Sequence, residues 1–361
     1  MRRFMLLGPL SSALLLAVAC GDDASEGSGA GTGSGSATAG PATATATATT
    51  TTTASTSTAT TQGSDSASSG SSSSTGNGST TGNGSTTGTT GGVTCDCTPG
   101  LDDGIFVLSS SAEIWKYAPD QQNPLGPGTF SKIGDLNCGG NTNTFSMAVD
   151  RNGFAWIMFG PSGPNAGDIW KADLTNNAAC SDPGYMTGQQ GVELFGMAFV
   201  SNSEFDACDK LYGNTYDGLG PFSEGPDAGT FLSVDPDTLV LSTIGPTNFN
   251  GAELTGTGDG RAFMFAGVPA KLLEVDKATG QIIDTWNLGL SLTNAFAFAF
   301  FGGDFYFFTE FEGDPTHSKV SWLDFDDSEG MFAAGPMNIN NNAPIRIVGA
   351  GVSTCAPIGP Q

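Results

Sequence analysis

A short strand that ends in aspartate and a turn recurs along the C-terminal part of this chain. Four copies share an apolar run followed by Asp: Ile169–Asp173, Phe231–Asp235, Leu272–Asp276 and Val320–Asp324. A degenerate copy, Ile114–Ala118, ends in alanine. An Asp side chain can cap the turn that follows it, and a Gly in that turn can adopt the positive φ that closes it. The repeat predicts that the chain is built from copies of one small β unit.

A second pattern precedes these copies. It consists of a strand of small and apolar residues, a tight turn and an aromatic strand, as in Met147–Ile157, Leu254–Met264 and Phe296–Phe308. Together the two patterns describe units of four antiparallel strands, spaced roughly 40 to 60 residues apart. Such units resemble the blades of a β-propeller. The resemblance spans about residues 104–355 and implies an all-β propeller, in which the five copies correspond to five blades.

The two ends of this region predict how the ring closes. Gly104–Leu108 starts at the aromatic second strand of a unit, with no first strand before it. Ile345–Ala350 resembles that missing first strand and has no unit after it. We therefore expect N- and C-terminal strands to share one blade. Two alternatives stay open: residues 203–229 are an insertion or part of a sixth blade, or the region forms two β-sandwich domains instead.

The N-terminus carries an export signal. Arg2 and Arg3 precede an apolar run, Phe4–Val18, and Ala19 and Cys20 follow it. This order resembles the signal peptide of bacterial lipoproteins. The resemblance implies that residues 1–19 are removed, that Cys20 carries the lipid, and that the protein is extracytoplasmic and lipid-anchored in the outer membrane. A plain signal peptide is the alternative, whereas about 15 apolar residues are fewer than the ~20 that a spanning helix needs.

Between the signal and the repeats lies a low-complexity segment. Residues 21–94 are nearly all Gly, Ser, Thr and Ala, and Val93 is their single large aliphatic residue. Such a composition offers no apolar burial to offset the entropy of ordering the backbone. We expect residues 20–94 to be the lipid-bearing cysteine and a disordered linker, and residues 95–361 to be the folded domain.

Six cysteines remain when Cys20 is set aside, and they are Cys95, Cys97, Cys138, Cys180, Cys208 and Cys355. An even number in an exported chain predicts three disulfides. Closure of the ring would bring Cys355 close to Cys95 and Cys97. We expect a bridge from Cys355 to one of these two, and pairing of Cys95 or Cys97 with Cys208 is the alternative.

The charge balance excludes one class of partner. The chain has 36 acidic and 12 basic residues, and two of the basic residues, Arg2 and Arg3, belong to the signal. A field of this sign repels phosphate backbones, so we expect no nucleic-acid binding. It suits a soluble surface domain and is compatible with divalent cations.

Catalytic candidates are few. His317 is the single histidine, so a nucleophile activated by histidine would have to use it, and it lies in a turn-like loop. Glu310 and Glu312 follow an aromatic strand, and paired carboxylates beside aromatic rings are the arrangement that glycoside hydrolysis requires. Such pairs are also common in acidic loops. We assign no catalytic residue, and these three come closest to one.

One acidic loop partly resembles a calcium-binding loop. Asp324, Asp326 and Glu329 place oxygen ligands along Asp324–Gly330, but Glu329 stands where the helix-loop-helix motif has Gly, and no Glu closes the loop. Glu204–Asp209 is a second acidic cluster. We expect solvated turns at both places, with calcium as the alternative, and we assign no metal and no other cofactor.

These observations lead to a function in general terms. The chain lacks a convincing pair of nucleophile and base, which favours a non-enzymatic binding or interaction role at the cell surface, with an unknown protein or saccharide as ligand. An exported hydrolase or lyase that uses carboxylates is the alternative. Converging carboxylates at the mouth of the ring would favour the enzyme, and a polar or aromatic surface would favour binding.

Overall fold

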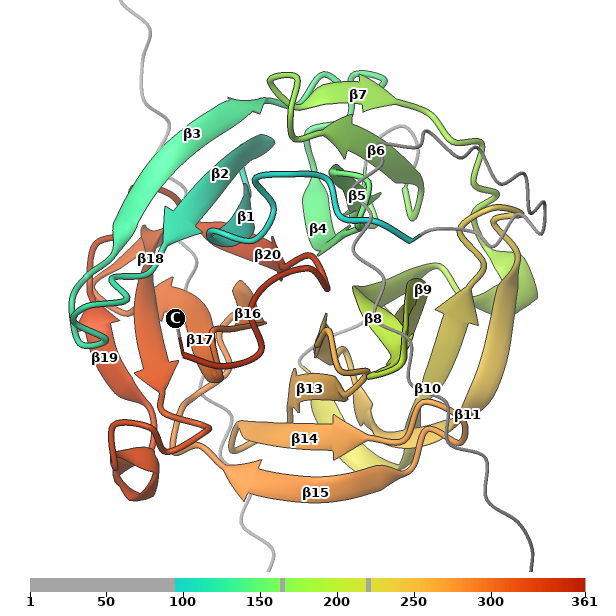
Figure 1. The fold of residues 1–361 in the computed structure, drawn as a ribbon. Helices are drawn as coiled ribbons and strands as arrows, with labels where there is room; N and C mark the ends of the chain where they lie inside the picture. The colour runs from blue at the N-terminus through green and yellow to red at the C-terminus, as the bar shows by residue number, and fades with distance from the viewer. Residues whose placement is uncertain (1–94, 163–165, 219–221, 361) are drawn as a thin grey trace, which may run out of the picture. The chain divides into compact units, whose positions relative to one another are not determined.

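The computed structural model describes residues 95–162, 166–218 and 222–360. In these ranges twenty strands form five four-stranded antiparallel sheets, accompanied by two short 3-10 helices, η1 (Gln189–Gly191) and η2 (Phe332–Ala334). Figure 1 shows the sheets arranged as blades around a central axis. The described domain is therefore a five-bladed β-propeller, as predicted, and neither a sixth blade nor a pair of sandwiches forms within these ranges.

The strands of each blade follow one another from the axis outward. They are β20 (Ile347–Gly351), β1 (Ile105–Ser109), β2 (Glu113–Ala118) and β3 (Thr129–Asp135) in blade 1; β4 (Thr144–Val149), β5 (Phe154–Phe159), β6 (Ile169–Asp173) and β7 (Ala179–Ser181) in blade 2; β8 (Leu194–Ser203), β9 (Asp206–Tyr216), β10 (Ser223–Val234) and β11 (Leu241–Asn250) in blade 3; β12 (Glu253–Gly256), β13 (Ala262–Ala266), β14 (Lys271–Val275) and β15 (Ile282–Asn287) in blade 4; and β16 (Phe296–Phe301), β17 (Asp304–Phe311), β18 (Asp314–Leu323) and β19 (Met337–Asn340) in blade 5.

Blade 1 is assembled from both ends of the domain. β20 pairs antiparallel with β1, with Val107 opposite Ala350 and Leu108 opposite Gly349. The predicted closure of the ring is confirmed. The irregular segment 203–229 contributes to the long hairpin of β9 and β10 in blade 3, and adds no blade of its own.

The repeated aspartates cap turns on three of the blades. Oδ1 of Asp173 accepts a hydrogen bond from the N–H of Thr175, two residues further on. Oδ1 of Asp235 accepts from the N–H groups two and three residues further on, and so does Oδ1 of Asp276. The expected capping role is confirmed for these copies. The fourth copy, Asp324, behaves differently, and its case is taken up below.

The core lies between the blades. Five clusters of buried apolar residues each join two neighbouring blades, and the aromatic stripe of β16 and β17 packs against Phe263 and Phe265 of blade 4. At the axis the inner strands approach so closely that a Cβ on Gly256 would overlap the carbonyl oxygen of Phe199. Small residues in the inner strands therefore allow five sheets to meet around one axis.

Three disulfides cross-link the domain. Cys97 pairs with Cys355, with Cα atoms 5.9 Å apart, and Cys95 pairs with Cys208 at 5.0 Å. Cys138 pairs with Cys180, which joins blades 1 and 2. The expected bridge from Cys355 to one of the two N-terminal cysteines is confirmed, and the other takes the alternative partner. Three bridges in one domain are typical of an extracytoplasmic protein.

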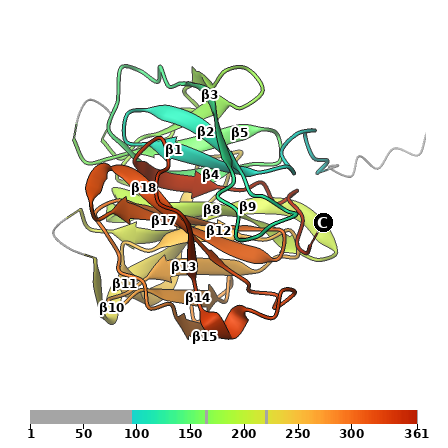
Figure 2. The same cartoon turned by 90° about the vertical axis from the view of Figure 1, so that its left-hand side faces the viewer.

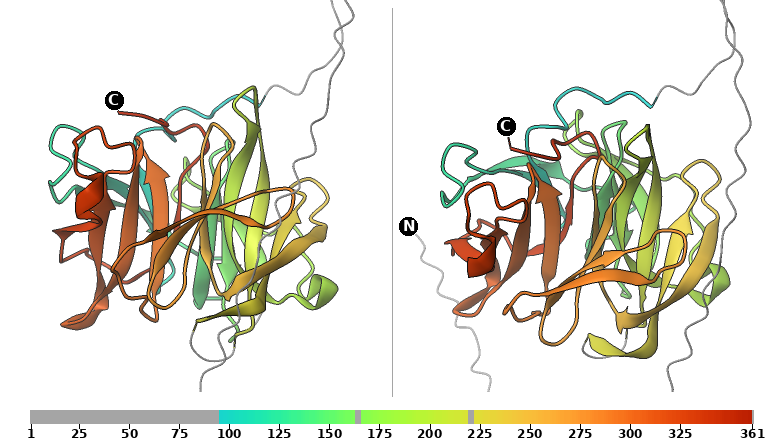
Figure 3. Two further views of the ribbon diagram at one scale, coloured as in Figure 1. Left: turned by 90° about the horizontal axis from the view of Figure 1, so that it is seen from below. Right: turned by 60° about the horizontal axis from the view of Figure 1, so that its bottom comes forward.

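The ends of the described chain distinguish the two faces of the ring. The first described segment, residues 95–104, and the last, residues 352–360, lie on the same side of the ring (Figures 2 and 3). We call this side the terminal face and the other side the pocket face. The predicted export signal, Cys20 and the predicted linker lie outside the described residues. In the part of the chain that the structure describes, no helix has the length and apolar character needed to cross a membrane.

Candidate ligand-binding site

A cavity of about 190 Å³ opens where the inner strands begin, at the axis of the pocket face. Every blade contributes to its lining: Thr144 from β4, Gly196 from β8, Glu253 from β12, Phe296 from β16 and Val348 from β20. We call it the axial pocket. Because these five residues lie in the first half of the inner strands, the position of the pocket follows directly from the fivefold arrangement.

Glu253 brings a buried carboxyl group to this pocket. Only 6 % of the residue is exposed. The hydroxyl of Ser146 donates a hydrogen bond of 2.8 Å to its Oε2, and the N–H of Met197 donates to the same hydroxyl at 3.2 Å. Burial raises the pKa of Glu253 well above its usual value, because the ionised form loses hydration, and the bond from Ser146 only partly opposes the shift. The group therefore favours its neutral, protonated form.

Arg346 places a guanidinium at the same pocket, and Glu310 holds it there. Oε1 of Glu310 accepts from Nε of Arg346 at 2.7 Å and lies 2.6 Å from Nη2. The backbone N–H of Asn294 donates to the other carboxylate oxygen of Glu310 at 3.0 Å. Glu310 is 8 % exposed, so its charge is buried and paired. The pair neutralises the cation and leaves its remaining N–H donors available to a ligand.

Aromatic rings form one wall of the pocket. Phe145 stacks on Tyr216, with ring centroids 5.7 Å apart and planes within 9°. Tyr216 lies 5.3 Å from Phe222, which contacts Phe296 edge-on at 4.7 Å. Rings from three blades thus make a continuous apolar surface beside the polar groups, which is the usual composition of a small-molecule site.

The axial pocket continues into two wider hollows on the same face. One, of about 730 Å³, shares Phe222 and Asn294 with the pocket and is also lined by Glu310 and by Val268, which is 69 % exposed. The other hollow, of about 410 Å³, shares Tyr216 with the first hollow. We call the three together the axial groove.

The candidate catalytic residues lie apart from one another. Glu310 reaches the groove, as described, whereas Glu312 is exposed in the turn between β17 and β18. His317 lies on β18, with its Nδ1 2.9 Å from Oδ2 of Asp314. Neither Glu312 nor His317 lines the axial pocket. Of the three, only Glu310 is placed where it can act on a ligand in the groove.

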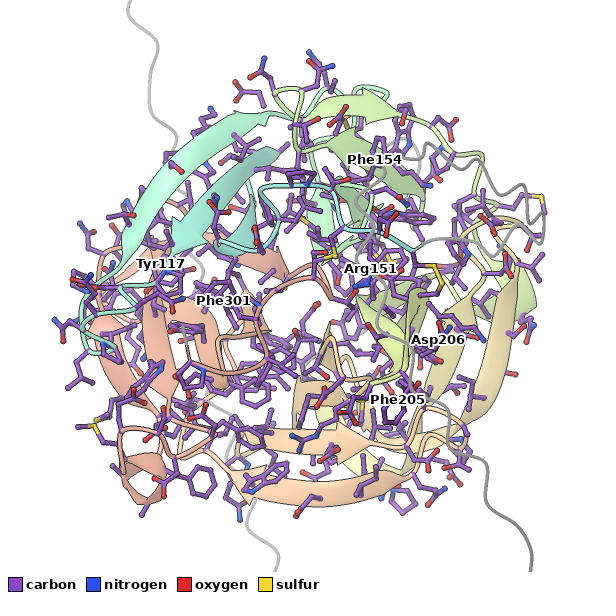
Figure 4. The ribbon with its side chains drawn as sticks, viewed as in Figure 1. Tyr117, Arg151, Phe154, Phe205, Asp206 and Phe301 are labelled. Carbon is purple, nitrogen blue, oxygen red and sulfur yellow. A yellow bond between two sulfur atoms is a disulfide. The ribbon has the colours of Figure 1, made fainter. Side chains whose placement is uncertain are left out.

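The calcium candidates come together on the terminal face. Asp324, Asp326 and Glu329 each place a carboxylate oxygen within 4.8 Å of the others, and Asp304 supplies a fourth at the same spacing. The second acidic cluster spans the turn between β8 and β9, where Figure 4 labels Phe205 and Asp206. Phe205 is 93 % exposed there.

Sequence reasoning missed the main residues of the axial pocket. Glu253 and Arg346 are charged residues at the start of two apolar inner strands, in a chain with few basic residues. A charge in a strand expected to line the axis was the available signal. The aromatic wall gave no such signal, because Phe145, Tyr216 and Phe222 resemble the many other core rings in the sequence.

Comparisons with known proteins give limited information about this domain. The sequence matches no protein-family model and no curated protein. Among solved structures it is similar to a chain of a nidogen/laminin complex, with 12 % identity and a TM-score of 0.37 over 70 % of this chain and 87 % of that one. It is similar to TolB from Acinetobacter baumannii, with 11 % identity, a TM-score of 0.37 and coverage of 67 % and 51 %. It is also similar to AztD from Citrobacter koseri, with 12 % identity and a TM-score of 0.29 over 66 % of this chain and 59 % of that one. The structure shows that the described domain is a five-bladed propeller with a polar and aromatic groove on its axis.

Proposed function

We propose that this protein is a cell-surface lipoprotein that binds a neutral, hydroxyl-rich ligand, such as a chain of sugar units, in the axial groove without transforming it. The observation that carries the proposal is the combination of groups at the axial pocket. Glu253 favours its neutral form, Arg346 is neutralised by Glu310, and aromatic rings stand beside them. Such a site offers many hydrogen bonds and apolar contact with little net charge.

The charge of the whole chain points the same way. With 36 acidic and 12 basic residues, the protein repels anionic ligands. The paired guanidinium of Arg346 offers no uncompensated positive charge that would attract them. A hydroxyl-rich, uncharged molecule escapes this repulsion. It can also pack the apolar face of its rings against Phe145 and Phe222, and donate to or accept from the amides around the groove.

The proposed anchor is consistent with this use of the groove. The described domain begins at Cys95, on the terminal face, and the groove opens on the other face. A linker that ran from a lipid on Cys20 to this point would attach behind the groove. We propose that the lipid holds the protein to the outer membrane and that the groove faces away from the point of attachment.

Substitution Cys20→Ser tests the anchor. The expected result is a shift of nearly all the protein from the membrane fraction to the soluble fraction, because the acyl chains bury about 0.8 kcal/mol per CH2 in the bilayer and no other contact replaces them. Fractionation and immunoblotting measure the shift. Membrane retention of the Cys20→Ser protein equal to wild type would refute the lipid anchor.

Binding is tested with the purified full-length protein and a panel of neutral oligosaccharides, by calorimetry or ligand-observed NMR. Asn294 is exposed and lines two hollows of the groove, so Asn294→Ala should weaken binding about tenfold, the equivalent of about 1.4 kcal/mol for a lost hydrogen bond. Asn152→Ala, on an exposed turn outside the groove, is the matched control and should leave the affinity unchanged.

Three results would contradict the proposal. The panel could fail to bind at millimolar concentration, the Asn294→Ala and Asn152→Ala proteins could bind equally well, or extended peptides could bind in the groove while saccharides do not. The last result would identify the ligand as a protein.

Glycoside hydrolysis is the second candidate function, and one observation favours it. A carboxyl that favours its protonated form and a second carboxylate lie around one groove, as an acid and a base would. Release of reducing ends from a bound oligosaccharide distinguishes the two functions. A hydrolase loses turnover in the Glu253→Gln protein, whereas a binding protein shows no turnover in either form.

A further inference from the structure

The last copy of the repeated aspartate departs from the pattern of the others. In Asp173, Asp235 and Asp276, Oδ1 accepts hydrogen bonds from the N–H groups of the turn that follows. In Asp324 the loop is longer, and Oδ2 accepts instead from the N–H of Met331, seven residues further on. Oδ1 of Asp324 has no hydrogen-bond partner, although the residue is only 1 % exposed. An unpaired carboxylate oxygen at this depth is costly unless something else pairs with it.

Three further carboxylates lie around the side chain of Asp324. One oxygen each from Asp304, Asp324, Asp326 and Glu329 lies within 4.8 Å of all the others. Oxygens bound to one calcium ion lie about 2.3–2.6 Å from it, so two of them are separated by at most about 5 Å. Magnesium, at about 2.1 Å, requires a tighter set. The spacing of the four groups therefore suits calcium.

The surrounding structure leaves room at this place. A cavity of about 40 Å³ lies beside the cluster, and two of the four carboxylates, Asp304 and Glu329, line it together with Phe301, which Figure 4 labels. At position 303, a Cβ would overlap Oδ2 of Asp326, so glycine there lets this carboxylate approach the turn. The volume is sufficient for a cation and a water molecule.

Negative charge in this cluster has no protein cation to balance it. Among the ion pairs of the described residues, none involves any of the four carboxylates. Four carboxylates that are crowded in this way, two of them buried, require either protons or a counter-ion.

We propose that Asp304, Asp324, Asp326 and Glu329 bind a calcium ion. The ion joins the long loop between β18 and β19 to the turn between β16 and β17. The turn between β16 and β17 also contacts the C-terminal segment, because the N–H of Gly302 donates a hydrogen bond of 2.9 Å to the carbonyl oxygen of Pro357. Pro360 lines the same cavity. The ion thus stabilises the part of the terminal face where the ring is closed.

Terbium luminescence tests the site directly in the purified full-length protein. Trp322 donates its indole N–H to Oδ2 of Asp304 at 2.8 Å, so a terbium ion in the cluster lies close to an efficient sensitiser. We expect sensitised emission that calcium displaces and magnesium, at the same concentration, does not. Calcium at a hundredfold excess over its Kd should also raise the Tm of the EGTA-treated protein by about 5 °C or more.

Two variants and a matched control assign these effects to the cluster. Asp324→Asn should abolish both signals. Glu329→Gln, at an exposed position that is not needed for folding, should weaken calcium binding at least tenfold. Asp276→Asn changes the same repeat position in blade 4, where the carboxylate caps its own turn, and should leave both signals unchanged.

The proposal is overturned if wild-type protein shows neither sensitised emission nor a calcium-dependent Tm, or if magnesium acts as well as calcium. It is also overturned if Glu329→Gln binds calcium as tightly as the control Asp276→Asn does. A protonated cluster without a metal would give the first of these results. None of these measurements depends on the ligand of the axial groove, so the two proposals fail or stand separately.

Discussion

Replacing Cys97 and Cys355 together by alanine is expected to lower the free energy of unfolding by about 5 kcal/mol. This disulfide joins residues 258 positions apart, and with Cys95–Cys208 intact it still closes a covalent loop of about 150 residues. Its loss also frees the C-terminal segment that follows β20, the strand that completes blade 1. Denaturant unfolding of the oxidised proteins, followed by tryptophan fluorescence, measures the difference.

The bridge between Cys138 and Cys180 provides the internal comparison. It spans 42 positions, so its removal should cost about 4 kcal/mol, roughly 1 kcal/mol less than the loss of Cys97–Cys355. A double variant of Cys97 and Cys355 that unfolds at the same denaturant concentration as wild type would show that pairing of β20 with β1 holds the ring closed without the covalent link.

Substitution Glu253→Gln is expected to stabilise the protein, and to do so more as the pH rises. Burial raises the pKa of Glu253 in the folded state, whereas in the unfolded chain it has its ordinary value near 4.5. Below that value both states hold the proton and the substitution has little effect through ionisation. Above it only the folded state does, so wild type loses about 1.4 kcal/mol of stability per pH unit until the folded-state pKa is reached. Glutamine keeps an acceptor for the hydroxyl of Ser146 and has no proton to lose.

Urea unfolding of both proteins at pH 5 and pH 7 measures this effect. The difference in unfolding free energy between variant and wild type should be larger at pH 7 than at pH 5, because burial raises the pKa of Glu253 in the folded state. Glu312→Gln, at an exposed turn, is the control, and its difference from wild type should be the same at both pH values. A constant difference for Glu253→Gln would mean that the carboxyl is ionised in the folded protein, and the neutral pocket proposed above would be wrong.

A stabilising substitution at this position also bears on function. A buried carboxyl that costs stability at neutral pH is retained by proteins mainly where it serves a site. Glu253 lies at the axial pocket, where the hydroxyl of Ser146 donates a hydrogen bond to it. If Glu253→Gln stabilises the domain and alters ligand binding, the cost of the carboxyl is explained by its role in recognition.

Much of the fold could be predicted because its signals are local. An aspartate that caps its own turn two or three residues further on repeats with the blades, as in Asp235 and Asp276, so the repeat is visible without any long-range information. The unmatched strands at Gly104–Leu108 and Ile345–Ala350 indicated the closure for the same reason. The bridge from Cys355 followed from that closure, although the choice between Cys95 and Cys97 did not.

The candidate sites could be predicted only in part. Asp324, Asp326 and Glu329 belong to one loop, so the sequence alone indicated a set of oxygen ligands. Asp304 joins them from the turn between β16 and β17, about 20 residues earlier, because β17 and β18 pair antiparallel and bring their opposite ends together. The unpaired oxygen of Asp324, on which the proposed cation site depends, is a consequence of burial and could not be read from the sequence.

The sequence by itself indicated the blade unit, the closure of the ring and the presence of three disulfides, because each depends on short-range alternation, on turn residues or on residue counts. Only the tertiary structure decided the axial pocket. Ser146 and Glu253 are 107 positions apart and meet because the inner strands of five separate blades begin at one point on the axis. Burial at that point raises the pKa of Glu253, and the pairing of Glu310 with Arg346 depends in the same way on which strands become neighbours when the ring closes.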